Sequence, residues 1–151
     1  MFAATDYHFN GGLKDSIANI LATKEFVVNL ATKKLQKFVV YSAIDAPHGV
    51  DEFKLMKLKK RKSTMVQPPS VVESPATLEC KLIKKIILKG KKNNQNIMII
   101  GEVIGIHIKD TFITKGKVNS LAMRAISRMG YTEYSEVKSR FLMDRPEYPG
   151  K

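Results

Sequence analysis

Two long β-rich stretches in the second half of the chain constrain its fold more than any other feature. Residues Ala76 to Leu88 and Asn96 to Lys109 are separated by a polar, glycine-containing segment, Gly90-Lys91-Lys92-Asn93-Asn94-Gln95. Two β-rich runs joined in this way predict a long antiparallel hairpin. The apolar phase slips at Ile83-Lys84-Lys85-Ile86, so we expect a β-bulge there. Strands of this length usually curl, which favours an antiparallel barrel over a flat sheet.

Weaker patterns predict short helices and strands around this hairpin. Ile17, Ile20 and Leu21 have helical spacing and predict a helix from Lys14 to about Thr23. The other expected elements are a strand end at Phe2 to Thr5, a turn at Asp6 to Gly12, a strand at Glu25 to Thr32, a helix at Lys33 to Ala43, a loop at Ala46 to Phe53, a strand at Thr111 to Thr114, a helix at Ser120 to Ile126 and a final polar tail. The helix at Lys33 to Ala43 has a strand as its alternative, because its Val-Val-Tyr run also favours β structure. The sum is a small α+β protein, mainly β.

Length and composition exclude several classes of protein. The chain has 151 residues and fits one domain, which we place at residues 1–138 with a C-terminal tail at 139–151. No apolar run reaches the roughly 20 residues of a membrane span, and the N-terminus lacks the pattern of a signal peptide, so we expect a cytoplasmic protein. The single cysteine, Cys80, is expected to face inward as a small apolar residue, with a reactive thiol as the alternative. The three histidines are far apart, and no metal site is expected.

The charge of the chain admits more than one interpretation. It carries 26 basic and 14 acidic residues, a formal net charge of +12, with basic residues concentrated in segments 54–62 and 81–92. The first segment has no aromatic residue between its charges for base stacking, and the second runs along a strand into a turn. A basic nucleic-acid-binding module is therefore the less favoured alternative. A solvated lysine-rich face, or attraction of phosphate-bearing cofactors, explains the charge as well.

Four motifs follow one another along the chain. The first is Lys14-Asp15-Ser16 through Asn19, followed by Glu25-Phe26-Val27-Val28-Asn29. The second is the loop Ala46-Pro47-His48-Gly49-Val50-Asp51-Glu52-Phe53. The third comprises Pro68-Pro69, Glu73-Ser74-Pro75 and Leu78-Glu79-Cys80, and the fourth comprises Ile100-Gly101-Glu102-Val103 through His107, Arg128-Met129-Gly130-Tyr131 and Tyr134. In this order they resemble the motifs of the flavin reductase-like family, the FMN-binding split barrels.

The resemblance implies a fold and a function. The fold is a split β-barrel, antiparallel and Greek-key-like, with short peripheral helices, and truncated at its N-terminus because family chains carry further strands before the position of Met1. The function is that of a flavoprotein oxidoreductase: a homodimer holds FMN at its subunit interface and passes electrons from NAD(P)H through FMN to flavin or another acceptor. A remnant that keeps the hairpin but binds no flavin is the main alternative. No catalytic side chain is expected, since the chemistry is that of the flavin.

The implied FMN site has a phosphate side and a ring side. Lys14 and the Ser16 hydroxyl resemble phosphate ligands at a helix N-terminus, with Asp15 and Asn19 beside them. Simple capping of that helix by Asp15 or Ser16 explains the same residues equally well. The ring side comprises Arg128, Gly130, Tyr131 and Tyr134.

Some of these residues suit a structural role as well as a place in the site. Arg128 has a structural alternative as a partner of Glu133 or Glu136, and Tyr131 occupies a position where the family usually has a second glycine. In the loop at 46–53, Asp51 and Glu52 suit turn and capping roles as well as a place near the flavin. A lone histidine on a strand is more often structural, so His107 is left out of the site.

Overall fold

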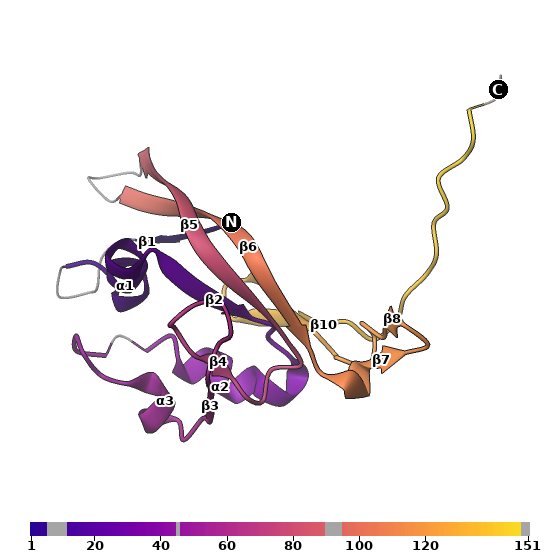
Figure 1. Cartoon of the computed structure of the whole chain (residues 1–151), viewed down its shortest axis with the longest axis horizontal. Helices are drawn as coiled ribbons and strands as arrows, with labels where there is room; N and C mark the ends of the chain where they lie inside the picture. The colour runs from indigo at the N-terminus through magenta and orange to yellow at the C-terminus, as the bar shows by residue number, and fades with distance from the viewer. Residues whose placement is uncertain (6–11, 45, 90–94, 149–151) are drawn as a thin grey trace.

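A four-stranded antiparallel sheet forms the centre of the protein in the computed structural model, which describes residues 1–5, 12–44, 46–89 and 95–148. The strand order is β1-β6-β5-β2, with β1 (Phe2–Thr5), β2 (Glu25–Asn29), β5 (Ala76–Lys89) and β6 (Gln95–Ile108). Three short helices, α1 (Asp15–Thr23), α2 (Gln36–Tyr41) and α3 (Glu52–Leu55), lie beside the sheet (Figure 1). The predicted α+β organisation, mainly β with short peripheral helices, is confirmed.

The predicted long hairpin is formed by β5 and β6. The pairing runs from Ala76 opposite Ile108 to Lys89 opposite Gln95. The register shifts between Leu82 and Lys84, where the phase slip predicted a bulge, and a second shift lies between Glu79 and Cys80. Bulges bend a strand and increase its twist. Figure 1 accordingly shows the two strands twisting along their length.

The core lies between α1 and one face of the sheet. Ile17 and Ile20 of α1 are buried against a cluster of sheet residues, which are Phe26, Cys80, Ile97 and Ile99. Phe2 of the edge strand β1 extends this cluster through an edge-to-face contact with Phe26, at 5.8 Å between ring centroids. The inward-facing position predicted for Cys80 is confirmed, because the side chain is buried. Burial raises the pKa of the Cys80 thiol, which disfavours the reactive thiolate.

The first half of the chain follows the sequence pattern closely. The helix expected from Lys14 to Thr23 is α1, and it ends at Lys24, whose left-handed backbone (φ 62°) allows its N–H to donate to the Ile20 carbonyl at 2.9 Å. The strand that follows is shorter than expected, since β2 ends at Asn29. The helix expected after it is present as a 3₁₀ turn, Lys33–Leu35, followed by α2, so the strand alternative is wrong. The predicted turn at residues 6–12 lies outside the described residues except for Gly12.

The segment between α3 and β5 crosses the opposite face of the sheet. It contains two short paired strands, β3 (Lys60–Arg61) and β4 (Ser70–Val71). The Val71 N–H donates to the Asn29 side-chain oxygen at 2.9 Å, which fixes β4 beside β2. The sheet is therefore covered by α1 on one face and by this 60–71 segment on the other.

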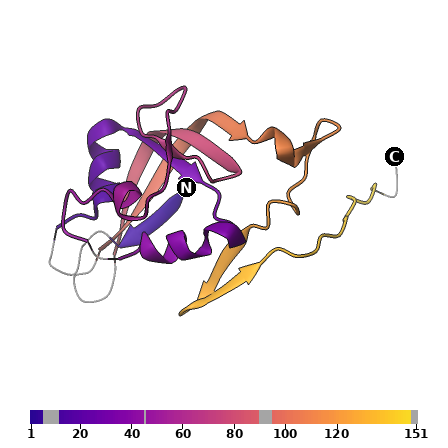
Figure 2. The same cartoon turned by 90° about the horizontal axis from the view of Figure 1, so that it is seen from below.

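A C-terminal arm, residues 109–148, projects from the end of the sheet (Figure 2). It contains a 3₁₀ turn (Asp110–Phe112), the pair β7 (Ile113–Thr114) and β8 (Lys117–Val118), and the pair β9 (Ile126–Gly130) and β10 (Glu133–Glu136). Residues 137–148 follow without regular structure. The strand predicted at Thr111 to Thr114 is thus reduced to its last two residues.

Two predictions for the arm are wrong. The expected helix at Ser120 to Ile126 is a series of turns, in which the Met123 N–H donates to the Ser120 carbonyl at 3.3 Å. Arg124 has φ 51°, which a right-handed helix cannot contain, and Ile126 already belongs to β9. The polar tail expected after residue 126 instead begins with the β9–β10 hairpin.

Candidate cofactor-binding site

The N-terminus of α1 is the first part of the predicted site. Lys14 is the residue that precedes the helix, and its side chain makes no hydrogen bond to cap it. Among the described residues, neither the exposed Lys14 ammonium nor the exposed Ser16 hydroxyl has a hydrogen bond or ion pair. The first N–H with an intrahelical acceptor is that of Ala18, which donates to the Lys14 carbonyl at 2.9 Å. The Lys14 and Ser16 side chains therefore remain available to an anion at the positive end of the helix dipole.

Asp15 makes a different contact from the one that capping requires. One carboxylate oxygen contacts the Nδ1 atom of His48, and the other accepts the Gly49 N–H at 3.2 Å. These contacts tie the loop at 46–53 to the start of α1. No hydrogen bond from a first-turn N–H of α1 to the Ser16 hydroxyl is present among the described residues, and capping stays the alternative interpretation of these side chains. Gly49 has φ 85°, a conformation that favours glycine at this bend.

The rest of that loop has a structural role. Asp51 accepts the Phe53 N–H at 3.0 Å at the start of α3, and its other oxygen lies 2.7 Å from the Lys60 ammonium. The Lys60 hydrogen bond and the backbone N–H groups hold the pKa of Asp51 below its ordinary value. The capping role considered for Asp51 is confirmed, while Glu52 begins α3.

A large groove opens beside the helix. It has a volume of about 880 Å³ and runs along β2, with α1 on one side and α2 and α3 on the others. Ser16 and Asn19 of the predicted site line its α1 side. Most of its lining is apolar, and four phenylalanines contribute to it from four different elements: Phe2, Phe26, Phe38 and Phe53. A groove of this size and character is typical of a site for an aromatic cofactor.

The ring-side residues lie elsewhere. Arg128, Gly130 and Tyr134 belong to the β9–β10 hairpin, and Tyr131 lies in its turn. Figures 1 and 2 both place this hairpin away from α1, so one chain does not bring the two halves of the predicted site together. Tyr131 has φ 47° and a 93% exposed side chain. The usual glycine of the family at this position is thereby explained, because the turn needs a left-handed backbone.

Arg128 pairs with neither of the glutamates considered as its structural partners. Arg128 donates from Nη2 to the Tyr131 carbonyl at 2.8 Å, across the turn of its own hairpin. Glu136 contacts Arg124 instead, and this hydrogen bond holds the pKa of Glu136 below its ordinary value. The pairing of Arg128 with Glu133 or Glu136 is therefore wrong for the described residues.

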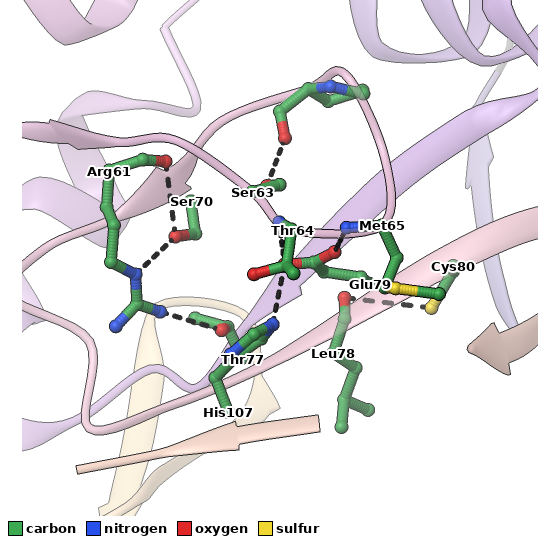
Figure 3. A network of polar contacts seen from close by, with 11 residues as sticks. Arg61, Ser63, Thr64, Met65, Ser70, Thr77, Leu78, Glu79, Cys80 and His107 are labelled. Carbon is green, nitrogen blue, oxygen red and sulfur yellow. Dashed lines mark hydrogen bonds and ion pairs between the residues drawn. The ribbon is translucent and has the colours of Figure 1, made fainter. Parts of the chain in front are cut away.

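A buried polar network was missed by the sequence pattern (Figure 3). Alternation in β5 had placed Glu79 opposite the inward-facing Cys80, yet Glu79 is only 1% exposed. Its carboxylate accepts the Thr64 N–H at 2.9 Å and the Met65 N–H at 2.6 Å, and His107 Nε2 lies 2.6 Å from it. The structural interpretation of His107 is in agreement with this contact. The one sequence signal for a special role of Glu79 was the Leu78-Glu79-Cys80 motif itself. Its burial was not predictable, because nothing in the neighbouring sequence shows that the 60–71 segment covers that face of the sheet.

The same face holds a second polar contact. Arg61 donates from Nε to the Ser70 hydroxyl and from Nη2 to the Thr77 hydroxyl, both at 2.9 Å. Thr77 and Ser70 are buried, so these hydrogen bonds satisfy polar groups that water does not reach. The 60–71 segment, which supplies Pro68 and Pro69 to the groove, is thus fixed to the sheet by Arg61 and Glu79.

Comparison with known proteins identifies the family to which the chain is similar. The profile of the flavin reductase like domain matches residues 12–121. An uncharacterized protein of Deinococcus radiodurans is 29% identical over 143 residues, which are 92% of this chain and 61% of that protein. The chain thus spans less than two thirds of the length of this relative.

Solved structures agree with this match. Nitrilotriacetate monooxygenase component B from Bacillus cereus superimposes with a TM-score of 0.81 at 24% identity, over 93% of this chain and 70% of that one. A Shewanella frigidimarina protein described as a flavin reductase with a split barrel domain gives 0.72 at 19% identity, over 88% and 65%. An FMN-binding protein from Thermus thermophilus gives 0.67 at 12% identity, over 94% and 72%.

These likenesses define the architecture as the split barrel of flavin reductases, of which the open sheet is a part. The chain belongs to the flavin reductase-like family. The resemblance to this family and the predicted fold class are confirmed, although the match ends before the motif at residues 128–134. No helix in the described part of the chain is long and apolar enough to cross a membrane.

Proposed function

We propose that this protein binds FMN and passes electrons from NAD(P)H through it to free flavin or another acceptor. The observation that carries the proposal is the start of α1, where the Lys14 and Ser16 side chains are exposed and have no partner among the described residues. A dianionic phosphate suits this arrangement, because it accepts hydrogen bonds and is attracted by the helix dipole. The FMN-binding protein among the structural neighbours supports the choice of flavin.

The residues around Lys14 fit the group in different ways. Lys14 supplies a cation and Ser16 a hydroxyl donor, and Asn19 lies one turn further along α1 at the groove. Asp15 positions the 46–53 loop through His48 and Gly49, which keeps its negative charge engaged. The flavin ring supplies the hydride chemistry when FMN is bound, and the chain supplies binding and orientation.

The ring side of the proposed site comes from a second copy. Arg128, Gly130, Tyr131 and Tyr134 lie on a hairpin that one chain holds away from α1. Tyr131 is exposed, so its ring is available to another surface. A homodimer that places this hairpin beside the α1 of its partner would complete the site, with Arg128 as a cation near the flavin ring and the tyrosines packed on it.

The test is an FMN titration of the double variant Lys14→Ala/Ser16→Ala. Each charge-assisted hydrogen bond lost is expected to weaken binding by roughly 1.5–3 kcal/mol, which together is at least a hundredfold in Kd. The matched control is Lys34→Ala/Ser120→Ala, which removes the same chemistry at exposed positions away from α1 and from the β9–β10 hairpin. Flavin fluorescence gives the Kd, and the absorption spectrum after desalting gives the flavin retained.

Two results contradict the proposal. One is a purified protein that is colourless and remains so after FMN is added and the sample desalted, because the site would then hold no flavin. The other is a Lys14→Ala/Ser16→Ala variant with unchanged FMN affinity and a lower melting temperature, because these residues would then stabilise α1 and not the phosphate. NAD(P)H oxidation by the FMN-loaded protein is the activity assay that follows.

A further inference from the structure

The groove along β2 contains an unpaired strand edge. β2 is the last strand of the described sheet, and its one strand partner there is β5. Residues from both of its faces line the groove, with Phe26 and Val28 on one and Val27 and Asn29 on the other. A free edge in an apolar groove is the geometry to which an extended segment adds as a further strand.

An extended segment without a partner is present at the other end of the chain. Residues 137–148 follow β10, and from 138 onward they show no regular structure or described hydrogen bond. Three successive apolar side chains in this C-terminal segment, Phe141, Leu142 and Met143, are 82%, 89% and 83% exposed. Burying each of these side chains would stabilise the protein by about 2 kcal/mol relative to leaving it in solvent.

The segment and the groove match in pattern and in charge. Side chains of a strand alternate, so an added strand would direct Phe141 and Met143 to one side of the β2 edge and Leu142 to the other. A continuous apolar run suits a strand that is covered on both faces, as the groove requires. The charged residues that line the groove are both acidic, Glu25 and Glu52, whereas Arg140 precedes the apolar run. Pro146 then ends the pairing.

We propose that, in the flavin-free protein, the C-terminal segment of a second copy of this chain occupies the groove, adding a strand along β2 with Phe141, Leu142 and Met143 buried in it. The segment of the same chain leaves on the side of the molecule opposite α3 (Figure 1). In a second copy, the segment follows directly on the β9–β10 hairpin, since it begins three residues after Tyr134. The proposal rests on the homodimer proposed above, in which that hairpin lies beside α1 and so delivers the segment to the groove.

The test is disulfide crosslinking between two single-cysteine-substituted variants in the absence of FMN. Leu142→Cys places a thiol in the segment, and Val28→Cys places one on β2 in the groove. The control is Ile106→Cys, which replaces another exposed β-branched residue of the sheet outside the groove. The native Cys80 is buried and does not compete. One variant of each mixture carries an affinity tag, so the mixed dimer is identified on a non-reducing gel.

The Leu142→Cys and Val28→Cys mixture is expected to give at least fivefold more mixed dimer than the Leu142→Cys and Ile106→Cys mixture. Equal yields overturn the proposal. The double variant Val28→Cys/Leu142→Cys at high dilution is the second measurement: an intrachain disulfide in the monomer would show that the segment folds back on its own chain, which also overturns it. Because no flavin is present, failure here is distinct from failure to bind FMN.

A substitution without cysteine gives an independent readout. Phe141→Ser is expected to raise the dissociation constant of the homodimer at least tenfold in sedimentation equilibrium. Tyr148→Ser, which alters an exposed aromatic side chain beyond Pro146, is expected to change it less than twofold. If both variants dissociate equally, the apolar run has no specific place in the interface and the proposal fails.

Discussion

The sheet with α1 and the C-terminal arm are built in opposite ways. The sheet unit buries a continuous apolar cluster around Ile17, Phe26 and Ile99, and its two long strands pair along their full length. The arm consists of two short hairpins and an extended segment, in which Met123 is the one buried apolar side chain described. Stability of this protein therefore resides in the sheet unit, and the arm is free to serve contacts with another surface.

The same difference divides the proposed site. The phosphate side lies at the end of α1, whose position is fixed by Ile17 and Ile20 in the core. The ring side lies on the β9–β10 hairpin, which is attached to the rest mainly through the 31–33 segment, as in the Ile126 N–H bond to the Ala31 carbonyl at 3.1 Å. In the proposed site, binding of the phosphate would thus depend on one rigid chain, and binding of the ring on how two chains meet.

The largest expected effect separates the two regions directly. Ile99→Ala removes a side chain with no exposure, and it should lower the free energy of unfolding by about 3 kcal/mol, since the cavity adds to the lost burial. Ile113→Ala on β7 of the arm is the matched change, and it should cost less, about 0.5 kcal/mol, because Ile113 is already 42% exposed. Urea unfolding followed by circular dichroism measures both. Equal costs would show that the arm is as tightly packed as the sheet.

The buried carboxylate of Glu79 makes the sheet unit sensitive to acid. Burial opposes ionisation, but the Thr64 and Met65 N–H groups and His107 outweigh it, so the pKa of Glu79 lies below its ordinary value. A depressed folded-state pKa means that the stability is present above the ordinary glutamate pKa and is lost as the pH falls through the folded pKa. Glu79→Gln should cost about 2 kcal/mol at neutral pH.

Urea midpoints between neutral pH and the acid range test this linkage. The decline in stability toward acid should be shallower for Glu79→Gln than for the natural protein. The exposed Glu133→Gln on the arm is the control and should leave the decline unchanged. If the stability of Glu79→Gln falls toward acid pH in parallel with that of the natural protein, the ionised carboxylate of Glu79 is not what holds the 60–71 segment on the sheet.

A close approach inside the sheet gives the next effect. A Cβ atom added at Gly101 would lie 2.4 Å from Cζ of Phe26, whose ring is buried and cannot move freely. Gly101→Ala should therefore destabilise the protein by about 1–2 kcal/mol. Gly105→Ala on the same strand meets its nearest atoms at 3.4 Å and should cost less. Thermal unfolding of the two variants measures the difference, and a reversed order would contradict the packing of Phe26 beneath β6.

The sequence predicted the sheet unit because its signals are local. Period-2 runs in β5 and β6, the bulge at Leu82 to Lys84 and the spacing of Ile17 and Ile20 need no distant contact to be recognised. The prediction for the arm failed because the structure of the arm depends on distant contacts. Ser120 to Ile126 has helical composition, yet the Arg124 carbonyl accepts the Lys33 N–H at 2.9 Å, and residue 124 adopts a left-handed backbone there.

In the candidate site, only the helix that carries the Lys14 motif was predictable from the sequence. The motif at Lys14 to Asn19 predicted a helix start, and α1 begins at Asp15. The contact of Asp15 with His48 and Gly49 was not predictable, because it joins residues more than thirty positions apart. Nor did the sequence show that Arg128 and its neighbours lie away from α1, since the distance between two motifs in space follows from topology and not from either motif.

The smallest expected effect has the opposite sign and lies in the arm. Tyr131 has φ 47°, a left-handed backbone that costs a non-glycine residue about 1 kcal/mol, and its exposed ring gains no packing within the chain in return. Tyr131→Gly should therefore stabilise the isolated chain by up to about 1 kcal/mol. Thr132→Gly, at the neighbouring turn position without a positive φ, is the control and should not stabilise it. If Tyr131 packs on flavin at the dimer interface, the same variant should bind FMN more weakly while it unfolds at a higher temperature. A loss of stability in Tyr131→Gly would mean that the side chain is already engaged in the free protein, and the arm would then not be held open for a partner.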